Sequence, residues 1–168
     1  MNALRRCGLP GSALTIEVTE SMELLNYPDL NQIFRQWKTH GIFISVDDFG
    51  TGYSSLSRLK EMDIDEIKID RCFVNNIQKS VYNQRLLNNI VELADGCQIH
   101  VCCEGVETAE ELALLEKLQP SLYQGFLFAR PCSEKEFSAQ YLCPKEELPW
   151  ASLRQKVSLP SSASETLP

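Results

Sequence analysis

Two adjacent carboxylates, Asp47 and Asp48, stand where an apolar strand, residues 42–47, runs into a turn bracketed by Gly50 and Gly52. Glycine lets the backbone turn sharply and lie close to a ligand. Paired carboxylates suit divalent cations that prefer oxygen ligands. The same pattern also occurs where an Asp-rich strand end only caps the following turn. Residues elsewhere in the chain bear on this choice.

Polar side chains stand near the carboxyl ends of further expected strands, each opposite an apolar face. The expected strands are 14–20, 42–47, 66–70, 99–104 and 122–128, and the polar residues are Glu17, Asp47, Lys68, Glu104 and Gln124. A lone Glu or Lys at a strand end is ordinarily a solvated rim residue. The same feature in five successive strands favours a shared site, because βα barrels build their active sites at the carboxyl ends of their strands.

Four carboxylates would lie together at the carboxyl end of the sheet, those of Glu17, Asp47, Asp48 and Glu104. Unpaired carboxylates repel one another and raise each other's pKa. Mg²⁺ or Mn²⁺ would relieve this repulsion, and two ions bridged by an Asp suit phosphodiester hydrolysis, because they activate a water and stabilise the leaving oxygen. Lys68 would orient or help deprotonate that water, or neutralise phosphate charge; the alternative is a structural ion pair with Asp47 or Asp48.

Helices are expected between the strands. They comprise 26–41, 56–59, 76–95, a helix opened by the capping box 108–111 and a helix opened by the capping box 133–136. Ile33 belongs to the apolar stripe of the first helix and Val81 to that of the third, whereas residues 1–13 are expected to be irregular. Strands that alternate with helices over long connections predict a parallel α/β sheet or barrel.

Composition narrows the classes of partner. The 168 residues, 43% of them hydrophobic, suit one domain with one core. A formal net charge of −7, without a basic cluster of more than two residues, disfavours nucleic acid polymers and anionic membranes as partners. No apolar run is long enough to span a membrane. Seven cysteines without CxxC spacing favour reduced thiols in a cytoplasm over disulfides or a zinc site.

Five motifs in this order resemble the EAL domain of bacterial cyclic di-GMP phosphodiesterases. They are IEVTES at 16–21, DDFGTGYSSL at 47–56, KIDRCFV at 68–74, EGVET at 104–108 and QGFLF at 124–128, followed by Arg130-Pro131. The resemblance covers about residues 3–142. It implies a TIM-like (β/α) barrel of the EAL type, often dimeric, that cleaves cyclic di-GMP to linear pGpG with Mg²⁺ or Mn²⁺.

The resemblance also implies roles for individual residues. Glu17 and Asp47 are similar to ligands of a first metal ion. Asp47 would bridge to a second ion, which Asp48 and Glu104 are placed to bind. Lys68 resembles the lysine that contacts the attacking water, and Gln124 resembles a site glutamine near the nucleophile. The catalytic residues would accordingly be Lys68, Glu104 and Gln124.

Supporting roles follow from the same resemblance. Glu20 is similar to the glutamate that holds the loop after Asp48, and Thr51 belongs to that loop. Residues 49–59 resemble a loop that links homodimer contacts to the metal site. Glu107 resembles a supporting glutamate near the substrate, so substrate binding and loop support would fall to Glu20, Thr51 and Glu107.

The chain departs from the family pattern in two substitutions and at its beginning. Cys72 stands where serine is common, and Cys103 where alanine is common. The Glu-Ala-Leu signature and an asparagine of the first metal site are absent, and the five expected strands are fewer than the roughly eight of such a barrel. We therefore expect an N-terminally truncated, incomplete barrel, a partial EAL domain over residues 1–143, and a disordered Pro- and Ser-rich tail over residues 144–168.

This incompleteness predicts weak metal affinity and little or no hydrolysis of cyclic di-GMP by the chain alone, because the first metal would lose two of its ligands. Turnover at ordinary enzyme rates by the monodisperse chain would contradict this expectation. Two other functions stay open: a non-catalytic remnant that binds cyclic di-GMP or a protein, and a metal-dependent hydrolase of another phosphoester. The expected location is cytoplasmic, either alone or as the cytoplasmic part of a longer membrane or sensor protein.

Overall fold

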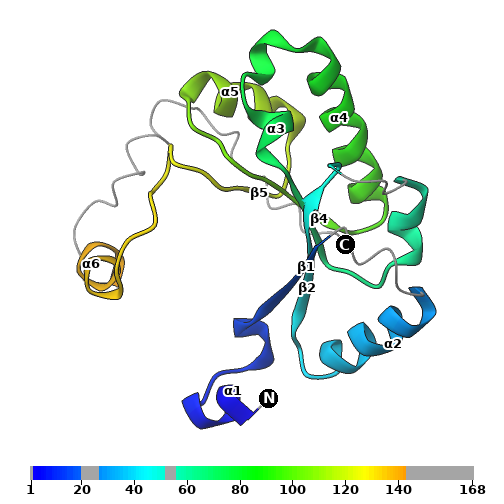
Figure 1. The fold of residues 1–168 in the computed structure, drawn as a ribbon, viewed down its shortest axis with the longest axis vertical. Coiled ribbons are helices and arrows are strands. Elements are labelled where there is room, and N and C mark those ends of the chain that lie inside the picture. Colours follow the sequence, from blue (N-terminus) through cyan, green and yellow to red (C-terminus); the bar gives the residue numbers. More distant parts are fainter. Residues whose placement is uncertain (1, 20–26, 52–55, 143–168) are drawn as a thin grey trace, which may run out of the picture. The chain divides into compact units, whose positions relative to one another are not determined.

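A computed structural model describes residues 2–19, 27–51 and 56–142 (Figure 1). The chain divides into two compact units, Met1–Leu127 and Phe128–Pro168. The first unit contains the β-sheet and every described residue of the candidate site, so it is the part of the molecule that positions the chemistry.

Five parallel strands form one sheet in the order β1-β2-β3-β4-β5. The strands are β1 (Thr15–Thr19), β2 (Phe43–Phe49), β3 (Glu66–Ile69), β4 (His100–Cys103) and β5 (Leu122–Tyr123). Because each strand pairs in parallel with the next one in sequence, every connection must cross back along the sheet, and helical segments occupy these connections. The parallel α/β architecture predicted from the sequence is confirmed, with β1 and β5 at the edges of the sheet that the described residues form.

Helical segments occupy the connections and also occur before β1 and after β5 in the sequence. The first unit contains α1 (Asn2–Cys7), α2 (Tyr27–Lys38), α3 (Arg71–Val74), α4 (Val81–Gly96), α5 (Ala109–Leu118) and the 3₁₀ turns η1 (Gly11–Ala13), η3 (Leu56–Glu61) and η4 (Ile77–Lys79). The second unit contains α6 (Glu134–Phe137) and the π-helical turn η5 (Ser138–Leu142). Capping boxes at Thr108 and Ser133 open α5 and α6, as predicted. The predicted tail, 144–168, lies outside the described residues.

Two predictions about where helices begin are wrong. Residues 2–7 form a helix where irregular chain is predicted. The helix predicted from Asn76 begins only at Val81, because Asn76 has a left-handed φ of 55°. The hydroxyl of Ser80 then accepts a hydrogen bond from the Asn83 N–H at 3.1 Å, which caps a new helix.

Strand β5 ends at Tyr123, although the sequence predicts a longer strand. The chain instead follows the loop after β4, where the Val106 N–H donates to Gln124 O at 3.1 Å and the Leu127 N–H donates to Val106 O at 3.0 Å. Gly125 permits this approach, because a Cβ at its position would lie 2.1 Å from Val106 O. Close packing of two loops therefore replaces strand pairing.

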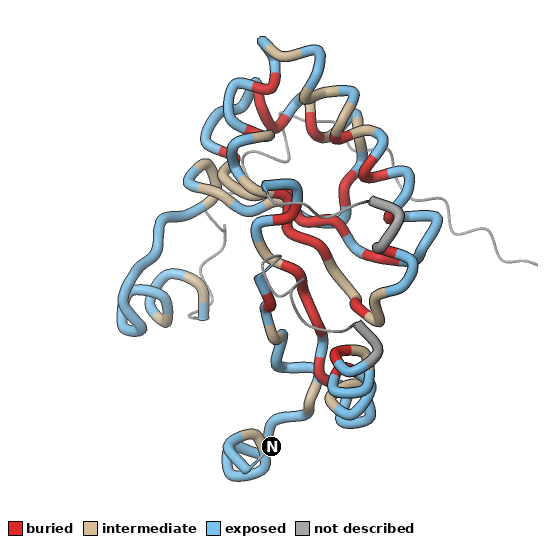
Figure 2. Tube along the Cα trace, turned by 45° about the vertical axis from the view of Figure 1, so that its right-hand side comes forward, coloured by how far each residue is buried: buried red, intermediate tan, exposed pale blue. Residues whose placement is uncertain are grey.

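The hydrophobic core lies between the sheet and the inward faces of α2 and α4 (Figure 2). Phe34 of α2, Leu87 of α4 and Ile67 of β3 are among its largest buried side chains. Burial of each contributes about 1.5–3 kcal/mol. Ile33 is 42% exposed and Val81 is 64% exposed, so these two positions of the predicted apolar stripes do not join the core.

Ion pairs fix the end of α2 to the segment that leads into β3. Lys38 Nζ lies 2.9 Å from Asp63 Oδ1 and 2.9 Å from Asp65 Oδ1, and Arg35 Nε lies 3.1 Å from Asp63 Oδ2. The hydrogen bond from Lys38 lowers the pKa of Asp63, although burial opposes it. Asp65 also accepts a hydrogen bond from the Ile44 N–H at 2.9 Å, so its carboxylate joins α2, β2 and the start of β3.

Among the residues that the structure describes, no helix has the length and apolar character needed to cross a membrane. The cysteines in these ranges all carry free thiols. Cys102 and Cys103 are buried, and burial raises the pKa of each thiol to about 12. Both are therefore protonated and poor nucleophiles at neutral pH.

We predict that Gln119→Gly stabilises the protein. Gln119 ends α5 with a left-handed φ of 54°, which glycine adopts without a Cβ penalty. The gain should be about 0.5 kcal/mol, because relief of strain exceeds the extra entropy of the unfolded chain. The same substitution at Gln36, an exposed position of α2, should instead lower the free energy of unfolding by about 1 kcal/mol. Urea denaturation compares the two variants, and a loss of stability at position 119 would contradict this prediction.

Candidate metal centre

Three carboxylates converge on the ammonium group of Lys68 at the carboxyl end of the sheet. Lys68 Nζ lies 2.8 Å from Glu104 Oε1, 2.9 Å from Glu17 Oε1 and 3.2 Å from Asp47 Oδ1. The Lys68 side chain is 9% exposed, whereas that of Glu17 is 51% exposed. The structure thus brings together strand-end residues that the sequence places in four separate strands.

The parallel register explains why these side chains meet. Lys68 of β3 pairs with Cys102 of β4. Residues two positions apart on a strand share a face, so Glu104 continues the face of Cys102 and lies on the side of Lys68. The Glu104 N–H still donates to Ile69 O at 3.1 Å, which keeps the residue at the end of the sheet. The β1–β2 register places the other two carboxylates on the same side.

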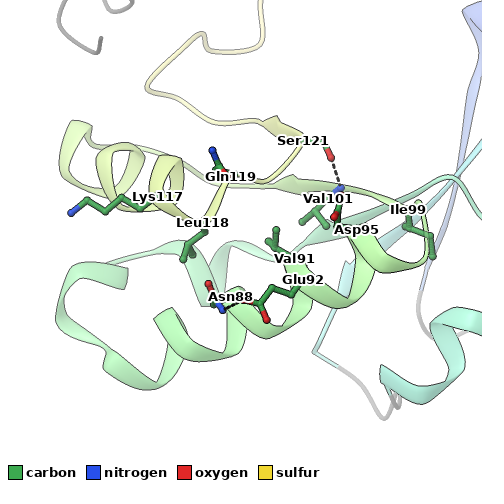
Figure 3. A pocket seen from close by; sticks show the side chains of 10 residues that line it. All are labelled: Asn88, Val91, Glu92, Asp95, Ile99, Val101, Lys117, Leu118, Gln119 and Ser121. Atoms are coloured by element: carbon green, nitrogen blue, oxygen red, sulfur yellow. Dashed lines mark hydrogen bonds between the residues drawn. The ribbon is translucent and has the colours of Figure 1, made fainter. Parts of the chain in front are cut away.

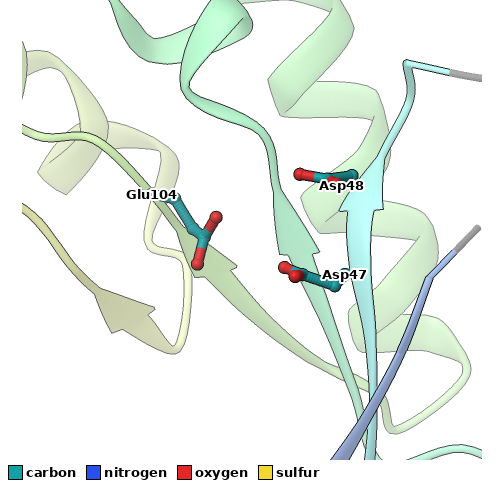
Figure 4. A group of neighbouring side chains, drawn as sticks. All are labelled: Asp47, Asp48 and Glu104. Atoms are coloured by element: carbon teal, nitrogen blue, oxygen red, sulfur yellow. The ribbon is translucent and has the colours of Figure 1, made fainter.

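An irregularity at the end of β2 redirects Asp48. The pairing of β2 with β3 shifts between Val46 and Phe49, and Asp48 has a left-handed φ of 55°. In a regular strand the side chains of Asp47 and Asp48 would point to opposite faces, whereas a bulge re-aims a side chain. Carboxylate oxygens of Asp47, Asp48 and Glu104 consequently all lie within 4.8 Å of one another (Figure 4).

The cluster carries more negative charge than Lys68 neutralises, because four carboxylates and one ammonium group leave a formal charge of −3. Burial lowers the pKa of Lys68, but its contacts with the carboxylates of Glu104, Glu17 and Asp47 outweigh burial and hold this pKa well above its ordinary value. Lys68 is therefore charged at neutral pH. Asp47 Oδ1 is buried and, within the described residues, lies near this ammonium group without accepting a hydrogen bond.

These features fit a hard divalent cation. Mg²⁺ and Mn²⁺ prefer carboxylate oxygens, which Glu17, Asp47, Asp48 and Glu104 supply. The buried Asp47 oxygen without a hydrogen bond offers a ligand atom within the cluster. A cation would also reduce the repulsion among the carboxylates. The roles predicted for the individual ligands stay predictions.

The loop after Asp48 is described only in part. The hydroxyl of Thr51 donates to Asp48 O at 2.9 Å, so Thr51 supports the turn that follows β2. Glu20 and residues 52–55 of the predicted dimer loop, 49–59, lie outside the described ranges. Their predicted roles are therefore not placed in space.

Backbone hydrogen bonds hold two further predicted site residues in place. The Gln124 N–H donates to Cys103 O at 2.9 Å, and the Glu107 N–H donates to Glu111 Oε2 at 3.0 Å. Both Gln124 and Glu107 are exposed. Within the part of the chain that the structure describes, neither side chain pairs with the carboxylate cluster.

Glu111 is a buried carboxylate whose full set of partners could not be predicted from the sequence. It is 3% exposed. The capping-box pattern predicts its bond to the start of α5, which is confirmed. Its hydrogen bond from Asn76, 35 residues earlier, has no local signal, because it depends on the packing of η4 against α5.

A cavity lies at the other end of the strands, between α4 and α5 (Figure 3). Its volume is about 370 Å³. It is lined by Asn88, Val91, Glu92, Asp95, Ile99, Val101, Lys117, Leu118, Gln119 and Ser121. None of the predicted site residues lines this cavity, so it is separate from the carboxylate cluster.

Comparisons with known proteins identify relatives of this chain. A family model described as EAL domain matches residues 1–131. The cyclic di-GMP phosphodiesterase NbdA of Pseudomonas aeruginosa is 37% identical over 130 residues, which cover 77% of this chain and 17% of NbdA. The cyclic di-GMP phosphodiesterase PdeR of Escherichia coli is 41% identical over 128 residues, which cover 76% of this chain and 19% of PdeR. The chain thus spans less than a fifth of the length of these relatives.

Solved structures share the fold. The PaMucR phosphodiesterase in complex with c-di-GMP matches with a TM-score of 0.74 and 38% identity, over 81% of this chain and 55% of that chain. Klebsiella pneumoniae BlrP1 with manganese and cyclic di-GMP at pH 9.0 matches with a TM-score of 0.73 and 36% identity, over 78% and 33% of the two chains. The EAL domain of Mycobacterium smegmatis DcpA has a TM-score of 0.77 and 30% identity, over 82% and 62%.

We predict that Lys68→Met destabilises the protein in the absence of divalent cations. The loss should be about 1–2 kcal/mol, less than for a fully buried ion pair because Glu17 is half exposed. Millimolar Mg²⁺ should restore more stability to the variant than to the wild type, since the unneutralised carboxylates then bind the ion. Chemical denaturation with and without Mg²⁺ measures both effects, and Lys60→Met at an exposed position is the control. Equal stabilities of variant and wild type without Mg²⁺ would contradict the neutralising role of Lys68.

Proposed function

The chain belongs to the EAL-domain family, and we propose from this premise that it carries the catalytic centre of a metal-dependent phosphodiesterase that acts on cyclic di-GMP. The match over residues 1–131 confirms the resemblance that the five motifs predict, and the solved EAL structures confirm the fold class. NbdA and PdeR, which are named cyclic di-GMP phosphodiesterases, support the choice of substrate.

One observation carries this proposal: the convergence of carboxylates around Lys68. Oxygens of Asp47, Asp48 and Glu104 lie within 4.8 Å of one another, and Lys68 contacts two of these residues together with Glu17. A cyclic dinucleotide carries two phosphodiester groups, which an uncompensated acidic cluster would repel. The same cluster loaded with divalent cations would attract them, so the charge of the site and the substrate are matched through the metal.

We assign the metal ligands as follows. Glu17 and Asp47 would hold one ion, and Asp47, Asp48 and Glu104 would hold a second. Bound Mg²⁺ or Mn²⁺ would supply a water of lowered pKa and neutralise phosphate charge. The structure of BlrP1 with manganese and cyclic di-GMP supports both the metal and the ligand.

The chain's own residues orient the reactants. The Lys68 ammonium group, fixed by its carboxylate partners, orients the attacking water and neutralises phosphate charge. The water oxygen bonds to phosphorus, the bond from phosphorus to one ribose 3′-oxygen breaks, and that oxygen takes a proton released by the water, which gives linear pGpG. We assign to Gln124 a role near the nucleophile, and to Glu20, Thr51 and Glu107 the support of the substrate and of the loop after β2.

Further parts of the proposal concern the chain as a whole. The EAL domain extends to residue 143, and residues 49–59 form the contact of a homodimer. The location is cytoplasmic, which the free thiols of the described cysteines support. A non-catalytic protein that binds cyclic di-GMP or another protein is the alternative, but such a protein has no need of the carboxylates that converge on Lys68.

We predict that Glu104→Gln in a full-length polypeptide, meaning one that also contains the Glu-Ala-Leu part of an EAL domain, lowers the rate of pGpG formation from cyclic di-GMP by at least about 100-fold with Mn²⁺ present, because the site loses a charged metal ligand. Glu92→Gln removes the same charge from the exposed face of α4 and should change the rate less than twofold. Chromatography of the nucleotide products measures both rates. Unchanged turnover in Glu104→Gln, or full activity of the wild type in excess EDTA, would contradict the proposed function.

A further inference from the structure

The carboxylate of Glu111 accepts hydrogen bonds from three backbone groups. Oε1 accepts from the Asn76 N–H at 2.8 Å, and Oε2 accepts from the N–H groups of Glu107 and Thr108 at 3.0 Å each. The Thr108 hydroxyl accepts in turn from the Glu111 N–H at 3.2 Å. With a side chain that is almost completely buried, Glu111 uses both of its oxygens inside the protein.

These bonds join two loops that leave neighbouring strands of the candidate metal centre. Asn76 belongs to the segment that follows β3, the strand of Lys68. Glu107 belongs to the segment that follows β4 and begins with Glu104. Glu111 therefore links the loop that follows β3, the strand of Lys68, to the loop that begins with Glu104, and Lys68 Nζ lies 2.8 Å from Glu104 Oε1.

A second contact joins the same two loops close to the cluster. Gly105, next to Glu104, has a φ of 70°, and a Cβ at its position would lie 2.4 Å from Arg71 Cβ. The loop after β4 therefore lies directly against the start of α3. Val106 adds the link to the β5 loop through its bonds with Gln124 and Leu127. The segment 104–108 therefore contacts the start of α3, the loop after β5 and the carboxylate of Glu111.

The hydrogen bonds of Glu111 go beyond those of an ordinary helix cap. A capping box needs only the exchange between Thr108 and Glu111, whereas the bond to Asn76 spans 35 residues. Burial raises the pKa of Glu111, but the hydrogen bonds from Asn76, Glu107 and Thr108 outweigh burial and lower it, so the group is ionised at neutral pH. An ionised carboxylate can accept on both oxygens, which an isosteric glutamine amide cannot do.

We propose that Glu111 is a positioning residue of the metal centre, which sets the segment 104–108 against the loop after β3 and so keeps Glu104 in place for metal binding. This inference rests on the proposed function. Replacing a residue that orients a metal ligand without binding the metal itself typically lowers metal affinity or activity by 10- to 100-fold. Glu111 would act in this way through backbone bonds, without touching the metal or the substrate.

The test compares Glu111→Gln with Glu110→Gln in the full-length polypeptide. Glu110 is exposed and lies beside Glu111 in the first turn of α5, so its substitution removes the same charge without the three bonds. We expect Glu111→Gln to weaken Mn²⁺ binding, measured by electron paramagnetic resonance, about tenfold and to lower kcat about tenfold, with KM for cyclic di-GMP within threefold. Glu110→Gln should change each quantity less than twofold.

Hydrogen exchange provides a readout that does not depend on activity. The N–H groups of Asn76, Glu107 and Val106 should exchange at least tenfold faster in Glu111→Gln, while the buried amides of β3 keep their protection. If Glu111→Gln does not fold, Glu111→Asp replaces it, because this shorter side chain keeps the charge but cannot reach both loops at once.

The outcomes separate the two claims. A folded Glu111→Gln protein with wild-type Mn²⁺ affinity and kcat overturns the positioning role and leaves the proposed function intact. A wild type that neither binds Mn²⁺ nor hydrolyses cyclic di-GMP overturns the proposed function. In that case faster exchange confined to segment 104–108 and Asn76 still supports the anchoring of the loops, and unchanged exchange overturns it.

Discussion

Three carboxylates share one ammonium group in this protein, and the arrangement of the candidate site depends on that shared charge. Lys68 is nearly buried and lies within 3.2 Å of oxygens from Glu17, Asp47 and Glu104. Removing a cation from water is unfavourable unless anionic partners compensate, and here the carboxylates do so. They still exceed Lys68 in charge, so the cluster remains strongly acidic. A divalent cation would offset this excess charge and let an anionic substrate approach, whereas the cluster without a cation would repel such a substrate.

The fold supplies this cluster through backbone register and close loop contacts. Parallel pairing brings the carboxyl ends of β1 to β4 together at one end of the sheet. A bulge at the end of β2 turns the side chain of Asp48 toward that of Asp47. Glycines at 105 and 125 let the loops after β4 and β5 approach their neighbours, where a Cβ would collide. The carboxylate of Glu111 holds the loop after β4 by hydrogen bonds from its backbone N–H groups. The acidic residues are therefore held by a framework of backbone contacts around the sheet edge.

Much of this framework could be predicted from period-two alternation. The faces of Glu17, Lys68 and Glu104 follow from the apolar residues beside them, and the parallel order follows from the long helical connections. The position of Asp48 could not be predicted in this way, because alternation places it opposite Asp47 and only the bulge reverses that placement. The early end of β5 and the late start of α4 depend on loop packing at Gly125 and on the left-handed backbone at Asn76.

Binding of divalent cations at Asp47, Asp48 and Glu104 is the central claim, and anomalous diffraction tests it most directly. Crystals grown with Mn²⁺ and data collected at the manganese absorption edge would locate the ions without any assumption about activity. We predict anomalous peaks within about 2.5 Å of carboxylate oxygens of Asp47, Asp48 and Glu104. Full Mn²⁺ occupancy elsewhere, with no peak in this cluster, would contradict the claim.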